Sequence, residues 1–192
     1  MNKIIAGLVL ISGLLFAGNN AQININNNTL ELESDIYLNN LYSMNNSSNY
    51  YFTVGYLSTE NDEGEIDQTL STIGFKVLNP YMNNYGLSFG IGMRNVYTDQ
   101  YDMGFSALPL VIYSKYELNE MVYFNLDLSF APQVLTYLDG EEYKEGKLLM
   151  NYKINSDAYI YVGVRYISTK YTDIEEDIEF DDAAFLGFKI NF

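Results

Sequence analysis

The 192-residue sequence contains no cysteine, no histidine and no tryptophan. Without thiols or imidazoles, a chain cannot build a cysteine nucleophile, a Ser-His-Asp triad, a haem ligand or a zinc site of the usual His/Cys kind. Enzymes embedded in bacterial outer membranes that pair a serine with a histidine base are excluded on the same ground. A lone pair of carboxylates could still act as acid and base, but no cleft can be identified from the sequence. We therefore expect a protein that is not an enzyme.

Basic residues are also scarce, with 10 Lys and Arg against 25 Asp and Glu and a formal net charge of −15. Phosphate backbones are bound through clustered Lys and Arg, so we expect no nucleic-acid partner. Hydrophobic residues nevertheless make up 48% of the chain, and 19 residues are tyrosine. A chain with both properties must separate its apolar residues from its charged residues in space.

Long apolar runs are missing except at the N-terminus, where Lys3 precedes an uncharged segment from Ile4 to Ala17. This order is typical of a secretory signal peptide, which we place at residues 1–21. The alternative is an uncleaved membrane helix, but the segment is shorter than the roughly 20 residues that a span needs. After residue 21 the longest apolar run, Leu108–Tyr113, is interrupted by Pro109. If the mature chain lies in a membrane, it must do so as a closed barrel.

From residue 49 onward, large apolar residues alternate with Gly, Ser, Thr and Asn in segments of roughly ten residues. Small residues on one face and large ones on the other predict an all-β fold. The specific prediction is a closed antiparallel transmembrane β-barrel of eight strands over residues 49–192, with lipid outside and a narrow, crowded lumen. The eight expected strands cover residues 50–59, 68–78, 85–98, 103–117, 122–137, 143–154, 158–171 and 182–192.

Residues 22–48 do not fit this count. Leu30, Leu32 and Ile36 alternate with acidic residues, which would add a ninth strand and make the number odd. We interpret the segment as a periplasmic lead-in or a strand associated with the barrel wall. A ten-stranded barrel with a strand split elsewhere remains an alternative.

The connections predict an orientation. Those at 79–84, 118–121 and 155–157 are short, whereas those at 60–67, 99–102, 139–146 and 173–181 are acidic and mostly longer. Outer-membrane barrels have short periplasmic turns and long external loops. The chain also ends on a strand with apolar Phe188 and Ile190 and a terminal Phe192, which resembles the signal that the bacterial barrel assembly machinery reads. We expect a monomer in the outer membrane of a Gram-negative cell, in contact with lipid and lipopolysaccharide.

The pattern resembles the YfaZ family of small outer-membrane proteins. The resemblance rests on the glycine-alternating segment LSFGIGMRNVY from Leu87 to Tyr97, the aromatic strand through Phe130-Ala131-Pro132, and Val162-Gly163-Val164-Arg165-Tyr166-Ile167 followed by a closing strand. It covers most of the mature chain. It implies a small barrel and its location, and it transfers no activity or catalytic residue.

Strand parity divides the charges into two groups. Eighteen of the 25 acidic residues fall in the acidic loops and the residue that follows the last of them. The inward parity instead carries mainly cations, with one clear acid, Asp127, so the lumen is expected to be positive. These inward residues are Lys76, Arg94, Lys115, Asp127, Lys153, Arg165 and Lys189. They would form either a buried network, with Asp127 and Glu117 pairing some cations, or the lining of a narrow anion-selective pore.

The densest acidic loop contains Asp173, Glu175, Glu176 and Asp177. Carboxylate oxygens suit Ca²⁺ or Mg²⁺, although the spacing is not that of an EF-hand loop. The alternative is a solvated loop, bridged to lipopolysaccharide phosphates by shared divalent ions. No other cofactor is expected. The function that these observations predict is a structural or surface-interaction role for a non-enzymatic barrel, with a narrow pore for small anions or other small solutes as the alternative.

Overall fold

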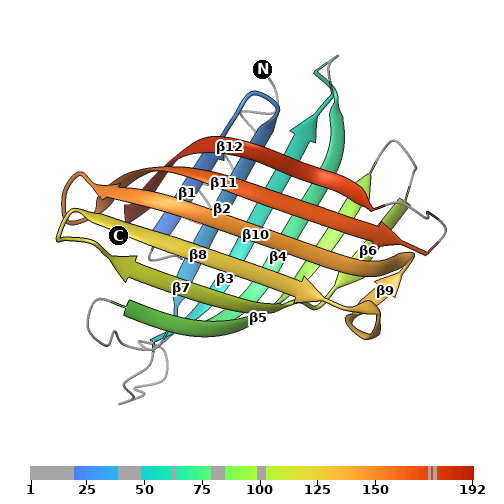
Figure 1. Cartoon of the computed structure of the whole chain (residues 1–192), viewed down its shortest axis with the longest axis horizontal. Coiled ribbons are helices and arrows are strands. Elements are labelled where there is room, and N and C mark those ends of the chain that lie inside the picture. Colours follow the sequence, from blue (N-terminus) through green and yellow to red (C-terminus); the bar gives the residue numbers. More distant parts are fainter. Residues whose placement is uncertain are drawn as a thin grey trace.

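In the computed structural model, ten antiparallel strands close into a barrel (Figure 1). The structure describes residues 20–38, 49–61, 64–78, 85–98, 103–172, 174 and 177–192. In ring order the strands are β1 (Asn20–Ile25), β2 (Thr29–Tyr37), β3 (Asn49–Glu60), β4 (Ile66–Leu78), β5 (Tyr85–Thr98), β7 (Leu110–Glu117), β8 (Val122–Ala131), β10 (Gly140–Lys153), β11 (Ala158–Tyr171) and β12 (Ile178–Asn191). The β1–β12 pairing closes the ring, with Ala21 opposite Ile190.

Two further strands, β6 and β9, are not members of the closed ring of ten, and prolines separate them from β7 and β8. β6 (Met103–Ala107) precedes Pro109 and pairs with the far end of β5, while β9 (Thr136–Leu138) follows Pro132 and the short helix η1 (Gln133–Leu135). β9 pairs with β6. Proline has no N–H to donate to a strand ladder, so each strand breaks there and resumes beyond the break.

The prediction of eight strands is wrong, because β1 and β2 complete the wall. The eight expected strands correspond to β3, β4, β5, β6 with β7, β8 with β9, β10, β11 and β12. The β1–β2 hairpin closes where the side chain of Asn26 accepts hydrogen bonds from the backbone N–H groups of Asn28 and Thr29, at 2.9 and 2.6 Å. Asn20 and Ala21, which the predicted signal peptide includes, belong to β1. Residues 20–37 are thus barrel wall and not a lead-in.

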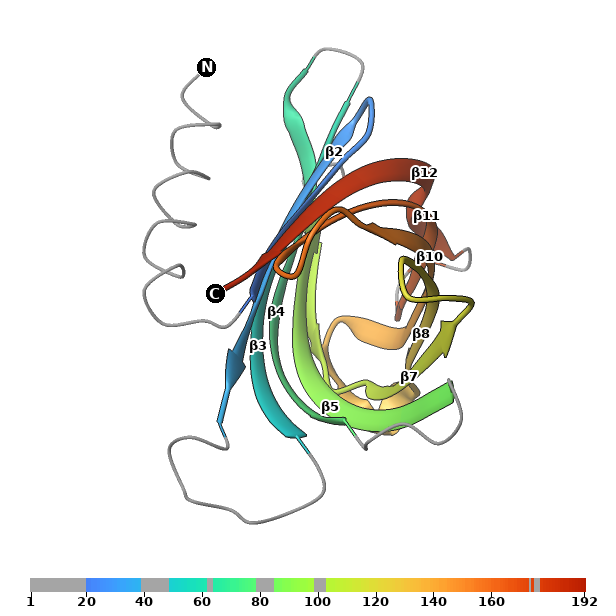
Figure 2. The ribbon, with the colours of Figure 1, turned by 90° about the vertical axis from the view of Figure 1, so that its left-hand side faces the viewer.

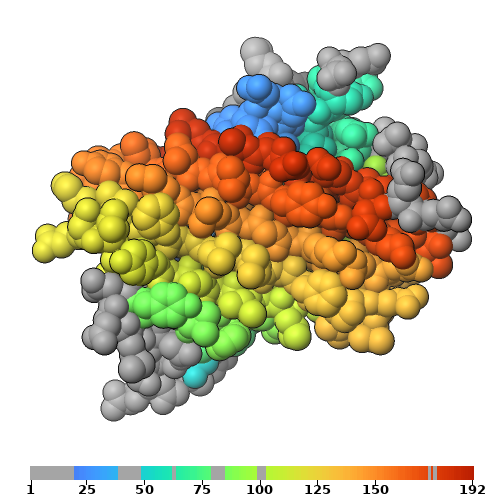
Figure 3. Space-filling model, viewed as in Figure 1, coloured from blue at the N-terminus to red at the C-terminus, as the bar shows by residue number. Residues whose placement is uncertain are grey.

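The two faces of the wall have the predicted composition. On β5, Phe89 is 53% exposed on the outside while its neighbour Ser88 is 5% exposed in the lumen. The side chains of β8, β10, β11 and β12 form a continuous outer surface on one side of the barrel (Figure 3). No helix in the described part of the chain is long and apolar enough to cross a membrane.

Figure 2 shows the strands curving round into a ring. The two ends of this ring differ in the segments that they hold. The terminal end holds Asn20, Phe192 and the turns at 118–121 and 154–157. The opposite end, which we call the plugged end, holds the turn at 26–28 together with Asn61, Gly64, Glu65 and Asp139. The expected loop at 139–146 does not exist, because β10 begins at Gly140 and Asp139 alone connects it to β9.

Candidate functional site

The plugged end is filled by an apolar cluster that we call the plug. Inward-facing side chains from opposite walls meet here, and Phe105 packs edge-on against Tyr171 with ring centroids 5.1 Å apart. Its buried members are Leu57, Leu70, Val96, Phe105, Ala107, Ala131, Tyr143, Ile167, Tyr171 and Phe180. None of them lines the cavity at the terminal end. Large apolar side chains are therefore gathered at the plugged end, and none of them reaches the cavity at the terminal end.

Beneath the plug, Arg165 is the centre of a buried ion-pair network. Its side chain is fully enclosed, and Nη1 lies 2.5 Å from Glu31 Oε2 while Nη2 lies 2.5 Å from Asp181 Oδ2. Lys147 reaches the second oxygen of Glu31 at 2.7 Å. A buried charge is costly unless it is paired and hydrogen-bonded. Because these four residues come from β2, β10, β11 and β12, the network ties opposite walls together.

Two more ion pairs lie beside this network. Lys76 Nζ is 2.6 Å from Asp35 Oδ2 and 3.9 Å from Glu33 Oε1. Arg94 Nη2 is 3.4 Å from Glu145 Oε2, which also accepts a 2.9 Å hydrogen bond from the Tyr143 hydroxyl. The first pair joins β4 to β2 on the same side of the barrel. The second joins β5 to β10, so this charged contact crosses the lumen.

The prediction of a positive lumen is wrong. The inward acids are Glu31, Glu33, Asp35, Asp127, Glu145 and Asp181, and the inward cations are Lys76, Arg94, Lys115, Lys147, Arg165 and Lys189. Sequence reasoning left the β2 acids outside the barrel and counted Glu145 and Asp181 as loop residues. Because the strands extend further than predicted, these acids point inward and neutralise the cations.

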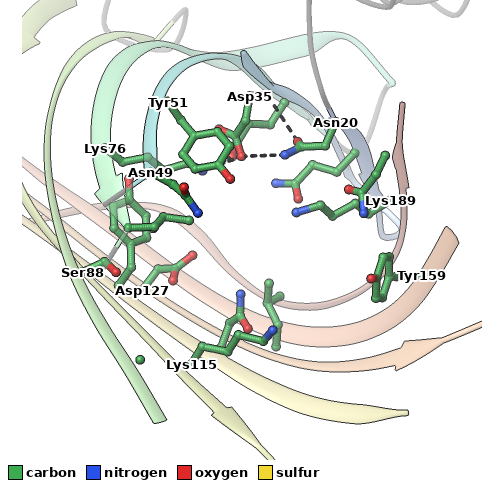
Figure 4. Close-up of a pocket in the computed structure, with 18 of the residues that line it drawn as sticks. Asn20, Asp35, Asn49, Tyr51, Lys76, Ser88, Lys115, Asp127, Tyr159 and Lys189 are labelled. Carbon is green, nitrogen blue, oxygen red and sulfur yellow. Dashed lines mark hydrogen bonds and ion pairs between the residues drawn. The ribbon is translucent and has the colours of Figure 1, made fainter. Parts of the chain in front are cut away.

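Towards the terminal end the lumen opens into a polar cavity of about 520 Å³, which we call the chamber (Figure 4). Its lining includes the predicted Lys76, Lys115, Asp127 and Lys189. Tyrosines contribute much of the remaining surface, namely Tyr37, Tyr51, Tyr113, Tyr123 and Tyr159. The Lys115 ammonium lies 4.2 Å from the centre of the Tyr123 ring. The chamber is thus lined by both charged groups and aromatic rings.

Lys189 and Asp127 differ from the other charges of the lumen. Asp127 on β8 and Lys189 on β12 both line the chamber (Figure 4), and no described residue forms an ion pair or hydrogen bond with either side chain. Lys189 and Asp127 are therefore charged side chains of the chamber that have no ion-pair or hydrogen-bond partner among the described residues.

Lys115, which lines the chamber, also has an acidic neighbour, whereas Lys153 and Asp177 do not line the chamber. Lys115 is 2.7 Å from Glu117, and Lys153 ends β10 with no described acid at ion-pair distance. Asp173, Glu175 and Glu176 fall outside the described residues, and Asp177 lies 3.9 Å from Lys144 Nζ. No group of three acidic side chains in the described segments could hold a metal ion. Phe188, Ile190 and Phe192 occupy the end of the chain in and after β12, and their role in assembly stays a prediction.

Sequence reasoning missed several residues of the lumen. Lys147 was on the inward parity but was not selected, and Tyr161 and Asn24 were not considered together. The Tyr161 hydroxyl donates to Asn24 Oδ1, and Asn24 Nδ2 donates to Glu31. The plug was missed although Leu57, Leu70 and Val96 share the inward parity of the predicted cations. Large apolar residues at inward-facing positions of successive strands were the feature of the sequence that could have predicted the plug.

A closed barrel with an apolar outer wall and a polar lumen is the arrangement of transmembrane β-barrels. The chain belongs to the YfaZ family, whose model, described as YfaZ precursor, matches residues 1–192. No curated protein matches the chain.

Among solved structures, the chain is similar to an anion-selective porin from Comamonas acidovorans, at 7% identity and a TM-score of 0.39, covering 84% of this chain and 47% of the porin. It is also similar to the CymD monoaromatic hydrocarbon channel, at 6% identity and a TM-score of 0.40, covering 90% of this chain and 50% of the channel. The chain thus spans about half the length of these two structures.

Proposed function

We propose that this protein is a non-enzymatic barrel of the Gram-negative outer membrane, with a structural or surface-interaction role and no conducting pore. The observation that carries the proposal is the plug, a cluster of buried apolar side chains at one end of the lumen. A conducting pore needs a continuous water-filled path lined by suitable groups. Here the inward cations that favoured an anion pore are mostly held in ion pairs, so they support the wall and do not line a path.

The membrane location is supported by the outer wall. Alternate residues of β5, β10, β11 and β12 expose large apolar side chains, which is the lipid-facing pattern of a transmembrane barrel. An even number of strands places both termini on one side, which we assign to the periplasm. The plugged end then faces the outside, and the chamber opens to the periplasm.

Fractionation and solute-flux measurements test these two claims together. The protein should be recovered with outer membranes and should migrate differently before and after heating in detergent, as a folded barrel does. Proteoliposomes that contain it should swell no faster in small sugars or salts than protein-free liposomes. Recovery in the periplasm would overturn the location, and rapid swelling would overturn the absence of a pore.

A second candidate function, a binding site for a small zwitterion, is favoured by Lys189 and Asp127. A ligand with one ammonium and one carboxylate could satisfy both unpaired groups inside the chamber, with a tyrosine face for its apolar part. Free amino acids are the simplest probes.

Isothermal titration of the folded barrel with a panel of aromatic amino acids should show binding that both Lys189→Met and Asp127→Asn weaken. Their amides and N-acetyl derivatives, which carry one charge only, should bind less tightly. Lys153→Met is the matched control, because this lysine does not line the chamber. Equal affinities for all variants, or no binding, would remove this candidate.

A further inference from the structure

One edge of β12 has a stretch that pairs with no strand in the described part of the chain. β1 ends at Ile25, opposite Leu186, so the part of β12 from Ile178 to Phe185 pairs with β11 on one side only. No described strand pairs with its other edge. An antiparallel strand directs the N–H and C=O groups of every second residue to each neighbour, so this edge presents unused donors and acceptors.

This edge borders a groove of about 800 Å³ at the plugged end. One wall of the groove is a run of consecutive residues, Glu179 to Leu186, which shows that the strand edge itself faces the space. The other wall is formed by the β1–β2 turn, Asn26 to Asn28, and by the ends of β3 and β4. The groove is separate from the chamber and shares no lining residue with it.

Hydrogen-bond acceptors without partners lie at the floor of the groove. Thr59 and Gln68 occupy opposed positions on β3 and β4, and both are 7% exposed. Neither Thr59 Oγ1 nor Gln68 Oε1 has a hydrogen-bond partner. Buried polar atoms are rarely left unpaired, because the loss of hydration is not offset. These two oxygens therefore indicate an N–H or O–H donor that the described residues do not supply.

The charge of the groove is negative. Asp67, Glu179 and Asp182 line it, and none of them forms an ion pair with a described cation. A second copy of β12 would bring the same acids against each other, and a lipid phosphate would meet the same repulsion. A bound metal ion is not favoured, since the described acids form no cluster that could hold one.

We propose that this groove binds an extended, basic peptide segment of a partner protein, which adds as a strand to the free edge of β12. Backbone hydrogen bonds to β12 provide the attachment, as in other cases of strand addition. Lysine or arginine side chains of the segment pair with Asp67, Glu179 and Asp182, and its donors reach Thr59 and Gln68. The proposal does not depend on which end of the barrel faces the cell.

Fluorescence anisotropy with the full barrel in a neutral detergent tests this proposal. The probe is a labelled peptide of alternating lysine and threonine, compared with the same peptide carrying N-methyl groups on alternate amides. N-methylation keeps every charge but removes the donors along one edge, so we expect affinity to fall at least about tenfold. Equal affinities for the two peptides would mean that binding depends on charge attraction alone and would overturn the proposal. The absence of any binding would overturn it as well.

Two triple variants test whether the peptide binds at the groove. Asp67→Asn, Glu179→Gln and Asp182→Asn together should weaken the unmethylated peptide at least about tenfold. The control removes three charges elsewhere at the plugged end, through Asp139→Asn, Glu141→Gln and Glu142→Gln, and should leave affinity unchanged apart from a small general effect. Equal losses in both triple variants would contradict a site at the groove.

Gln68→Met separates binding from folding. Because Gln68 Oε1 has no partner in the barrel, the variant should unfold at the same or a higher denaturant concentration while binding the peptide more weakly. A variant that loses stability but keeps full affinity would assign Gln68 a purely structural role and contradict its part in the site.

Discussion

Arg165 Nη1 on β11 lies 2.5 Å from Glu31 Oε2 on β2, across the barrel lumen. This contact joins the N-terminal hairpin to the C-terminal strands, because Arg165 also holds Asp181 on β12. The same hairpin closes the ring through the β1–β12 pairing. The hairpin that completes the ten-stranded ring therefore also supplies Glu31, one of the acids that pair with the cations of the lumen.

Replacement of Arg165 by methionine should destabilise the barrel severely. Glu31 would keep its ion pair with Lys147 and its hydrogen bond from Asn24, but Asp181 would remain buried without an ion-pair partner among the described residues. Removing one member of a buried pair typically costs about 3–5 kcal/mol. Urea unfolding in lipid vesicles measures this, with Lys170→Ala as the control, since the Lys170–Glu141 pair is exposed to solvent. A loss in Arg165→Met no larger than in Lys170→Ala would contradict the role of the network.

Arg165→Lys should recover only part of this loss. The guanidinium binds Glu31 and Asp181 through separate nitrogens, and it also donates to Thr29 Oγ1 at 3.3 Å. A lysine ammonium is a compact charge and cannot reproduce this fork. The same unfolding measurement is expected to place Arg165→Lys between the wild type and Arg165→Met. Full recovery would mean that charge alone matters at this position.

Gly187→Ala should perturb the lumen through Tyr161. A Cβ atom at Gly187 would lie 2.1 Å from Tyr161 Cε2, on the ring that reaches across to Asn24. Overpacking of this kind typically costs about 1–3 kcal/mol. The double variant with Tyr161→Leu should recover stability relative to the sum of the two single changes.

Gly146→Ala is the matched control for this glycine, because the nearest atom to its added Cβ is 3.7 Å away. Thermal unfolding, followed by far-ultraviolet circular dichroism, measures the stability of both variants. If Gly187→Ala were as stable as Gly146→Ala, the close packing of Tyr161 over β12 would be wrong.

The β1–β12 seam can be tested by disulfide formation, since the chain has no cysteine of its own. Ile23 and Phe188 are opposite each other on the outer face, so Ile23→Cys with Phe188→Cys should cross-link under mild oxidation. The pair Ile23→Cys with Leu186→Cys, displaced along the strand, should cross-link poorly. Equal yields of cross-linked protein would contradict this register. If neither double variant formed a cross-link, the placement of β1 beside β12 would be wrong.

The alternation of residues predicted most of the fold from the sequence. Large outward and small inward side chains located β3 to β12, because this pattern is a direct consequence of strand geometry. β1 was missed since its inward Asn20, Gln22 and Asn24 resemble a polar linker that follows a signal peptide. β2 was recognised as alternating, but without its partner β1 it gave an odd number of strands.

The lumen was harder to predict than the wall. Parity correctly placed Arg94 and Arg165 in the lumen, yet it could not identify Glu145 and Asp181 as their partners. Those acids lie near strand ends, where composition alone does not separate strand from loop. The chamber and the groove arise from register between strands distant in the sequence, which a single sequence does not specify.

The central claim, that the plug blocks the barrel, is tested most directly by single-channel recording in planar bilayers. The wild-type barrel should show no steady openings. Phe105→Ala with Tyr171→Ala removes the two rings of the plug that pack edge-on. This variant should produce openings, and its heat-modified mobility in detergent would show that it still folds. Steady anion-selective openings of the wild type, reduced by Arg94→Ala, would contradict the account and identify the protein as a channel.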